Sequence, residues 1–119
     1  MEKVQVARQF WPEEILRLPQ VEMPVAGATG YTLVNDEKQV TFLHFEEGTA
    51  VPDHSHAAQW GYLVRGEMIL EIDGRSELYQ AGDVYYIPAG TRHRTVFTRE
   101  SWVIDMGDDP RRYPVHREP

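Results

Sequence analysis

Three of the five histidines have a spacing that suits a metal site. His54 and His56 are separated by one residue, so on a β-strand their side chains point to the same face. Two imidazoles placed in this way can reach one ion, and little chain entropy is lost in bringing them together. His93 follows the turn-forming segment Pro-Ala-Gly at 88–90, and an antiparallel neighbouring strand would bring it beside the first two. Imidazole nitrogen suits first-row divalent metals, so the spacing predicts a metal centre.

The elements that would position these histidines are short β-strands. Met68 and Leu70 alternate with Glu67 and Glu71 along the chain, which is the period of a half-buried strand. Turn signals recur about every 8–12 residues through the middle of the sequence, which is typical of a β-sandwich or barrel. Residues 11–16 carry the single helical pattern, which Pro19 limits to about a turn and a half.

Composition excludes several classes of site and partner. The 119 residues are enough for one domain, and the formal charge of −7 argues against binding to nucleic acid or to an anionic membrane surface. The chain has no cysteine, so disulfides and zinc–thiolate sites are excluded and any metal must be held by nitrogen and oxygen. Neither a signal peptide nor an apolar run of membrane-spanning length is evident, so we expect a cytoplasmic protein without a membrane partner.

The segment around the first two histidines resembles the first motif of the cupin superfamily. Gly48 precedes His54 by five intervening residues, and one residue separates His54 from His56, as in that motif. The motif continues with an acidic residue, six further residues and a glycine. Counting back from Gly66 places Gln59 at the acidic position, with a loop after His56 that is one residue shorter than usual.

The segment around the third histidine resembles the second cupin motif. Gly82, Pro88, Gly90 and His93 occupy matching positions, whereas Phe97 replaces the asparagine that ends the motif. Together the two motifs cover nearly half of the chain, and their combination is highly specific for a small single-domain cupin.

The resemblance implies an all-β fold, the double-stranded β-helix or jelly-roll barrel of two antiparallel sheets, with the metal inside near one mouth. We assign residues 31–107 to the barrel and residues 1–30 to an N-terminal extension that packs on the barrel or on a dimer partner. Residues 108–119 form a C-terminal tail, expected to be loop. The implied cofactor is one divalent transition metal ion, chosen from Fe, Mn, Ni, Zn and Cu.

The expected ligands are His54, His56 and His93, with Gln59 as the fourth. Glutamine can ligate through its carbonyl oxygen but cannot act as a base at neutral pH. Gln59 either ligates directly, which we favour, or hydrogen-bonds a metal-bound water. A set of neutral ligands leaves the ion's +2 charge uncompensated, which favours an anionic or deprotonated oxygen ligand in the open positions.

A mostly apolar pocket is expected beside the metal. Gly61 would leave space there for a substrate, although simple close packing is nearly as good an explanation. One of Tyr85 and Tyr86 should face inward, and we take Tyr86 as the pocket residue. The expected pocket residues are Phe45, Gly61, Leu63, Met68, Leu70 and Tyr86.

Trp60 and Tyr62 should then face outward, where exposed aromatic side chains need a cover. Either the N-terminal residues 10–16 fold over them or a second subunit does. Since small cupins are commonly dimers, we expect a homodimer.

Two hypotheses for the function follow. In the first, a metal-dependent cupin acts on a small oxygenated substrate, a diol, dicarbonyl or phenol, with chemistry of the oxygenase, isomerase or lyase type. In the second, the barrel is a non-catalytic, metal-containing module that binds or senses a small molecule. The sequence places no Asp or Glu in the pocket, and this keeps the second hypothesis open.

Overall fold

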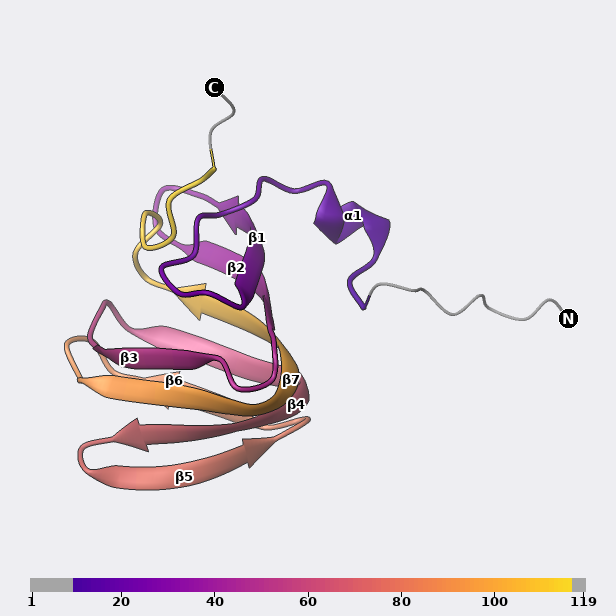
Figure 1. Cartoon of the computed structure of the whole chain (residues 1–119). Helices are drawn as coiled ribbons and strands as arrows, with labels where there is room; N and C mark the ends of the chain where they lie inside the picture. The colour runs from indigo at the N-terminus through magenta and orange to yellow at the C-terminus, as the bar shows by residue number, and fades with distance from the viewer. Residues whose placement is uncertain (1–9, 117–119) are drawn as a thin grey trace, which may run out of the picture.

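A computed structural model of the chain describes residues 10–116 and consists almost entirely of antiparallel strands (Figure 1). Its elements are α1 (Glu13–Leu16), β1 (Ala28–Val34), β2 (Gln39–Phe45), β3 (Ala50–His54), β4 (Gln59–Ile72), β5 (Arg75–Gln80), β6 (Val84–Ile87) and β7 (His93–Gly107). The short α1 agrees with the helical pattern in the sequence. No helix within residues 10–116 has the length and apolar character needed to cross a membrane.

The two longest strands, β4 and β7, join the two layers of the fold. The first part of β4 pairs with β6 and the second part with β5, while β7 pairs with β3 at its start and with β2 at its end. Strands β4 and β7 also pair with each other over most of their lengths. Hydrogen bonding therefore runs continuously from one antiparallel layer into the other, and the predicted all-β jelly-roll architecture is confirmed.

Gly66 lies where β4 bends between the two layers. The pairing of β4 with β7 shifts register on both sides of this residue, and its φ is 109°. A Cβ atom at this position would overlap Ser101 and the backbone oxygen of Glu100. Both the positive φ and the close approach of β7 therefore require glycine.

Strict alternation along the strands builds the interior. In β2, every second residue from Gln39 to Phe45 is buried, which is the pattern of a strand with one face toward a core. Leu43, Leu63, Met68 and Val103 are almost completely shielded from solvent. Each such side chain stabilises the fold by about 1.5–3 kcal/mol relative to exposure.

The structure corrects the choice between the two neighbouring tyrosines. Tyr85 is buried and Tyr86 is 46% exposed, so the prediction that Tyr86 faces the pocket is wrong. The reason is the strand pairing: Tyr85 lies opposite Gly61, and cross-strand partners share a face of the sheet. A Cβ atom on Gly61 would overlap the Tyr85 ring, so that ring fills the space we had expected to be open for substrate.

The N-terminal segment packs at a different place from the outward-facing aromatic residues of β4. Phe10 stacks on Trp102 with ring centroids 4.7 Å apart, and Trp11 contacts Phe42 edge to face at 5.6 Å. Trp60 and Tyr62 remain 51% and 42% exposed. Cover by residues 10–16 is therefore wrong for these two side chains, and the homodimer stays a prediction.

The C-terminal segment, residues 108–116, runs beside the segment that precedes β1. The backbone N–H of Glu22 donates to Pro114 O at 2.8 Å, and that of His116 donates to Gln20 O at 2.6 Å. Figure 1 shows both segments at the same end of the molecule, near β1 and β2. Residues 108–116 contain no strand, yet they are packed on the barrel, because Tyr113 is only 8% exposed.

The Gly61–Tyr85 contact generates a stability prediction. We expect Gly61→Ala to lower the free energy of unfolding by about 1–3 kcal/mol, because the added methyl group must displace a buried ring. The measurement is chemical denaturation of both proteins in the same buffer.

Gly107→Ala is the matched control, since an added Cβ there meets only Ala58 O at 3.8 Å. It should change stability by less than about 0.5 kcal/mol. Equal effects of the two substitutions would show that the Tyr85 ring does not need the space at Gly61.

Candidate metal centre and cavity

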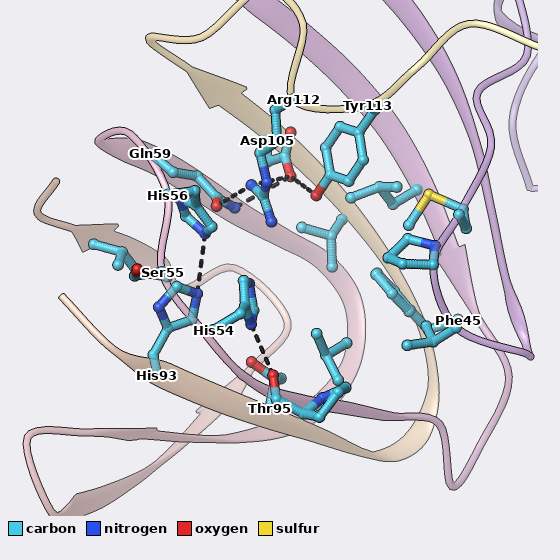
Figure 2. A pocket seen from close by; sticks show the side chains of 18 of the residues that line it. Phe45, His54, Ser55, His56, Gln59, His93, Thr95, Asp105, Arg112 and Tyr113 are labelled. Carbon is cyan, nitrogen blue, oxygen red and sulfur yellow. Dashed lines mark hydrogen bonds and ion pairs between the residues drawn. The ribbon is translucent and has the colours of Figure 1, made fainter. Parts of the chain in front are cut away.

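The structure brings the three predicted histidines together from two parts of the chain. His54 ends β3, His56 lies in the loop that follows, and His93 begins β7 as the cross-strand partner of His54. Their ring centroids are 4.2 to 5.0 Å apart, and one ligand nitrogen from each lies within 4.8 Å of the others. Figure 2 shows the three rings along one side of a cavity.

A hydrogen bond to a backbone carbonyl oxygen orients each of the three imidazoles. The Nδ1 atom of each ring lies against a backbone carbonyl oxygen, which can only accept a hydrogen bond, so each Nδ1 carries the proton. Each Nε2 atom is then unprotonated and presents its lone pair as a metal ligand. The distances are 2.8 Å from His54 to Pro52 O, 2.7 Å from His56 to Ala57 O and 3.0 Å from His93 to Thr91 O.

The arrangement of these nitrogen atoms fits a cation. The Nε2 atoms of His56 and His93 are 3.1 Å apart, and with both protons on Nδ1 two lone pairs face each other. Burial lowers the pKa of all three imidazoles, that of His56 to about 4, so the rings are neutral at pH 7. Three neutral imidazoles with converging lone pairs match the donor set that divalent transition metals prefer.

Gln59 lies in the same cavity, but its amide is already engaged. Its Nε2 donates to Asp105 Oδ2 at 3.1 Å, and its Oε1 accepts a hydrogen bond from Arg112 Nη1. To ligate the ion, this carbonyl oxygen would have to keep Arg112 as a second partner or give up its hydrogen bond with Arg112. Direct ligation by Gln59 stays a prediction.

Asp105 is the buried carboxyl group of the site, and the sequence analysis missed it. It lies on the inward face of β7 and is 2% exposed. Burial raises its pKa to about 6, although the nearby Arg112 guanidinium and the hydrogen bond from Tyr113 act in the opposite direction. Because Asp105 follows the inward Val103 by two residues, the alternation along β7 could have revealed it.

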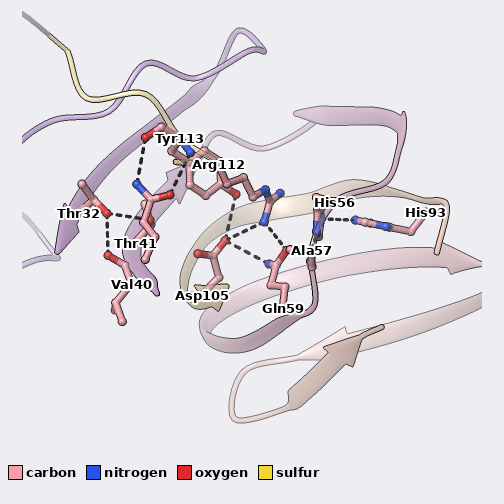
Figure 3. A network of polar contacts seen from close by, with 11 residues as sticks. Thr32, Val40, Thr41, His56, Ala57, Gln59, His93, Asp105, Arg112 and Tyr113 are labelled. Carbon is pink, nitrogen blue, oxygen red and sulfur yellow. Dashed lines mark hydrogen bonds and ion pairs between the residues drawn. The ribbon is translucent and has the colours of Figure 1, made fainter. Parts of the chain in front are cut away.

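Arg112 and Tyr113 enter the site from the C-terminal segment. Tyr113 Oη donates to Asp105 Oδ2 at 3.0 Å, and Arg112 Nη1 lies 3.7 Å from the same oxygen (Figure 3). Together with the contact from Gln59, these interactions all end on Oδ2 of Asp105. No pattern in the sequence predicts the roles of Arg112 and Tyr113, because both residues lie in a segment without periodicity.

A buried glutamine holds this segment in place. Gln39 Nε2 donates to Tyr113 O at 3.0 Å, and its Oε1 accepts from the Tyr113 N–H at 2.9 Å. Gln39 is 2% exposed, so both contacts are shielded from water. Among neutral side chains, an amide can satisfy a backbone donor and acceptor at the same time in this way. This contact fixes the backbone beside Arg112.

The cavity beside the histidines has a volume of about 590 Å³. Of the expected pocket residues, Phe45 lines it. Leu63, Met68 and Leu70 do not line it; they belong to the hydrophobic core. Those three predictions, like Tyr86, are wrong, and the space at Gly61 is filled by Tyr85.

Comparison with known proteins places the fold in context. The cupin domain family model matches residues 41–103. KdgF from Halomonas sp. has 26% identity and a TM-score of 0.69, over 77% of this chain and 86% of that one. An RmlC-like cupin from Shewanella frigidimarina has 26% identity and a TM-score of 0.72, over 89% and 94% of the two chains.

A more distant likeness shows the fold alone. Salicylate 1,2-dioxygenase from Pseudoaminobacter salicylatoxidans has 13% identity and a TM-score of 0.67, over 74% of this chain and 26% of that one. No curated protein sequence matches the chain significantly. Since the family model covers more than half of the sequence and both motifs lie entirely within the matched residues, the chain belongs to the cupin domain family.

Proposed function

We propose that the protein holds one divalent transition metal ion through His54, His56 and His93 and uses it to act on a small oxygenated molecule. The observation that carries this proposal is the arrangement of the three rings, each with Nδ1 against a backbone carbonyl and with one ligand nitrogen from each within 4.8 Å of the others. The substrate is a diol, dicarbonyl or phenol, and the chemistry is of the oxygenase, isomerase or lyase type.

The ion would serve as a Lewis acid that lowers the pKa of a bound substrate oxygen and stabilises the anion formed. Three protein ligands leave coordination positions of the ion open for such a molecule. Gln59 is proposed as a fourth ligand when the molecule does not occupy all of these open positions. The polar end of the cavity, which contains the histidines, Gln59, Asp105 and Arg112, supports this assignment.

Asp105 is proposed to take the proton that the substrate loses. Its contacts with Gln59, Tyr113 and Arg112 all end on Oδ2, so Oδ1 can accept the proton without breaking them. Arg112, with its side chain 18% exposed, is proposed to stabilise negative charge on the substrate. The C-terminal segment supplies Arg112, Tyr113 and Pro114 to the cavity lining, and Gln39 holds the backbone of Tyr113 in place.

The first test is elemental analysis of protein purified without added metal. We expect about one equivalent of a divalent transition metal per chain, and loss of that metal in the double variant His54→Ala/His56→Ala, because one imidazole cannot hold the ion alone. His44→Ala is the control, since His44 pairs with Glu100 at 2.7 Å outside the cavity and should not affect metal content. Native protein that stays free of metal after reconstitution would contradict the proposal.

The second test measures turnover by the metal-loaded protein on a panel of diols, dicarbonyls and phenols. For any compound that is converted, Asp105→Asn should reduce kcat by roughly 10²–10⁴-fold, because a proton acceptor of nearly the same size is lost. Tyr113→Phe removes one hydrogen bond to the same carboxylate and should reduce kcat by less than about tenfold.

Unchanged turnover in Asp105→Asn would exclude Asp105 as the proton acceptor. A thermal shift with a compound, but no product from any member of the panel, would contradict the enzyme hypothesis and support the non-catalytic binding module.

A further inference from the structure

The cavity has two chemically different ends. At one end the three histidines, Asp105 and Arg112 supply nitrogen donors and charge, and at the other end the walls are hydrocarbon. Figure 2 shows the histidines on one side and Phe45 on the opposite side, with side chains of the lining between them. A ligand that fills this space meets both environments.

A pair of stacked rings forms part of the hydrocarbon end. Phe45 and Phe97 lie with ring centroids 3.9 Å apart and planes 9° from parallel, and both line the cavity. Phe97 stands where the second cupin motif ends in asparagine, so this chain has a phenyl ring where the motif has an amide. The departure from the motif makes this wall of the cavity apolar.

The two ends are far enough apart to select for ligand length. His93, Thr95 and Phe97 follow one another on the inward face of β7, and all three line the cavity. Phe97 is four residue steps along the extended strand from His93, which separates the two backbone positions by about 13 Å. A molecule with only a few atoms would reach the histidines without touching the rings.

Part of the cavity wall comes from segments that lie before and after the residues matched by the cupin family model. Met23, Pro24 and Val25 line it from the N-terminal side, and Pro114 lines it from the tail, whereas the match covers residues 41–103. These four side chains extend the apolar part of the cavity surface. They lie outside the residues that the family model matches.

The charges favour an anionic head group. Among the described residues that line the cavity, Arg112 and Asp105 carry opposite charges 3.7 Å apart. Glu22 also lines the cavity, and its carboxylate lies 3.7 Å from Nδ1 of His116. The three imidazoles are neutral ligands, so they leave the charge of the proposed ion uncompensated. A carboxylate on the ligand would balance that charge and could also accept from Arg112.

We infer that the small oxygenated molecule taken by this cavity also carries a carboxylate and an extended apolar body, preferably aromatic. Its head group would bind at the histidines and Arg112, and its body would lie along the apolar wall toward Phe45 and Phe97. The binding of the head group rests on the proposed function, because it needs the metal ion. The preference for an apolar body depends only on the apolar lining of the cavity.

The test is calorimetric titration of the metal-loaded native protein with three probes. 4-Phenylbutanoate carries both features, D-gluconate has a carboxylate on a polar body, and 4-phenylbutan-1-ol has the same body without the charge. We expect 4-phenylbutanoate to bind at least about tenfold more tightly than D-gluconate, since burial of a phenyl ring contributes roughly that much. It should also bind more tightly than the alcohol, since only the carboxylate can balance the charge of the ion and accept from Arg112. Equal or tighter binding of D-gluconate would overturn the apolar body, and equal binding of the alcohol would overturn the carboxylate.

Two variants at Phe97 test whether the apolar body of the ligand lies against this side chain. Phe97→Asn, which restores the motif residue, should weaken 4-phenylbutanoate at least about tenfold with unchanged metal content, whereas Phe97→Leu should weaken it less. No difference among the three proteins would overturn the assignment of the apolar end. If Phe97→Asn does not fold, the comparison of probes on the native protein still decides the inference.

Metal analysis of the same samples separates the two proposals. A metal-free protein that still prefers 4-phenylbutanoate to D-gluconate would contradict the proposed function and support the apolar body. A metal-loaded protein without that preference would overturn the inference and leave the metal centre intact.

Discussion

The inward Nε2 atoms of His56 and His93 repel one another unless a cation lies between them, and one ligand nitrogen of His54 lies within 4.8 Å of both rings' ligand atoms. Backbone carbonyls fix the protons on the outer nitrogens, and the Nε2 atoms of His56 and His93 approach to 3.1 Å. Burial disfavours protonation, which would otherwise relieve the contact. The surrounding strands therefore hold an arrangement that a metal ion would stabilise, and pairing of β3 with β7 is what brings two of the rings together.

A second network connects the metal centre to the C-terminal segment. Gln59 lies beside the histidines and bonds both to Asp105 and to Arg112, and Tyr113 completes the contacts of the carboxylate. Gln39, on β2, holds the backbone of Tyr113 from the other side. Residues that are distant in sequence thus form one polar cluster. Gln39 contributes to the position of Arg112 by holding the backbone of Tyr113, the next residue along the chain.

Much of the fold and part of the site could be predicted from the sequence. The histidines and motif glycines identified the barrel because their spacing reflects strands and turns of fixed geometry. The pocket was harder, because a turn at Gly82 breaks the alternation and only the pairing of Gly61 with Tyr85 shows which tyrosine faces inward. Leu63 and Met68 do point inward, but alternation does not tell a packed core from a cavity wall.

The polar cluster around Asp105 could be predicted from the sequence only in part. Asp105 could have been found by counting along β7, whereas Arg112 and Tyr113 occupy a segment without periodicity whose place depends on tertiary contacts. The expected role of Gln59 rested on its position in the motif alone. Its contacts with Asp105 and Arg112 require three-dimensional information that sequence spacing does not contain.

The most direct test of the metal centre is a crystal structure with anomalous diffraction data collected on both sides of the absorption edge of the metal found in the protein. We predict a single strong peak at bonding distance from the Nε2 atoms of His54, His56 and His93. A peak bound elsewhere, or metal-reconstituted crystals with no peak between these rings, would contradict the account.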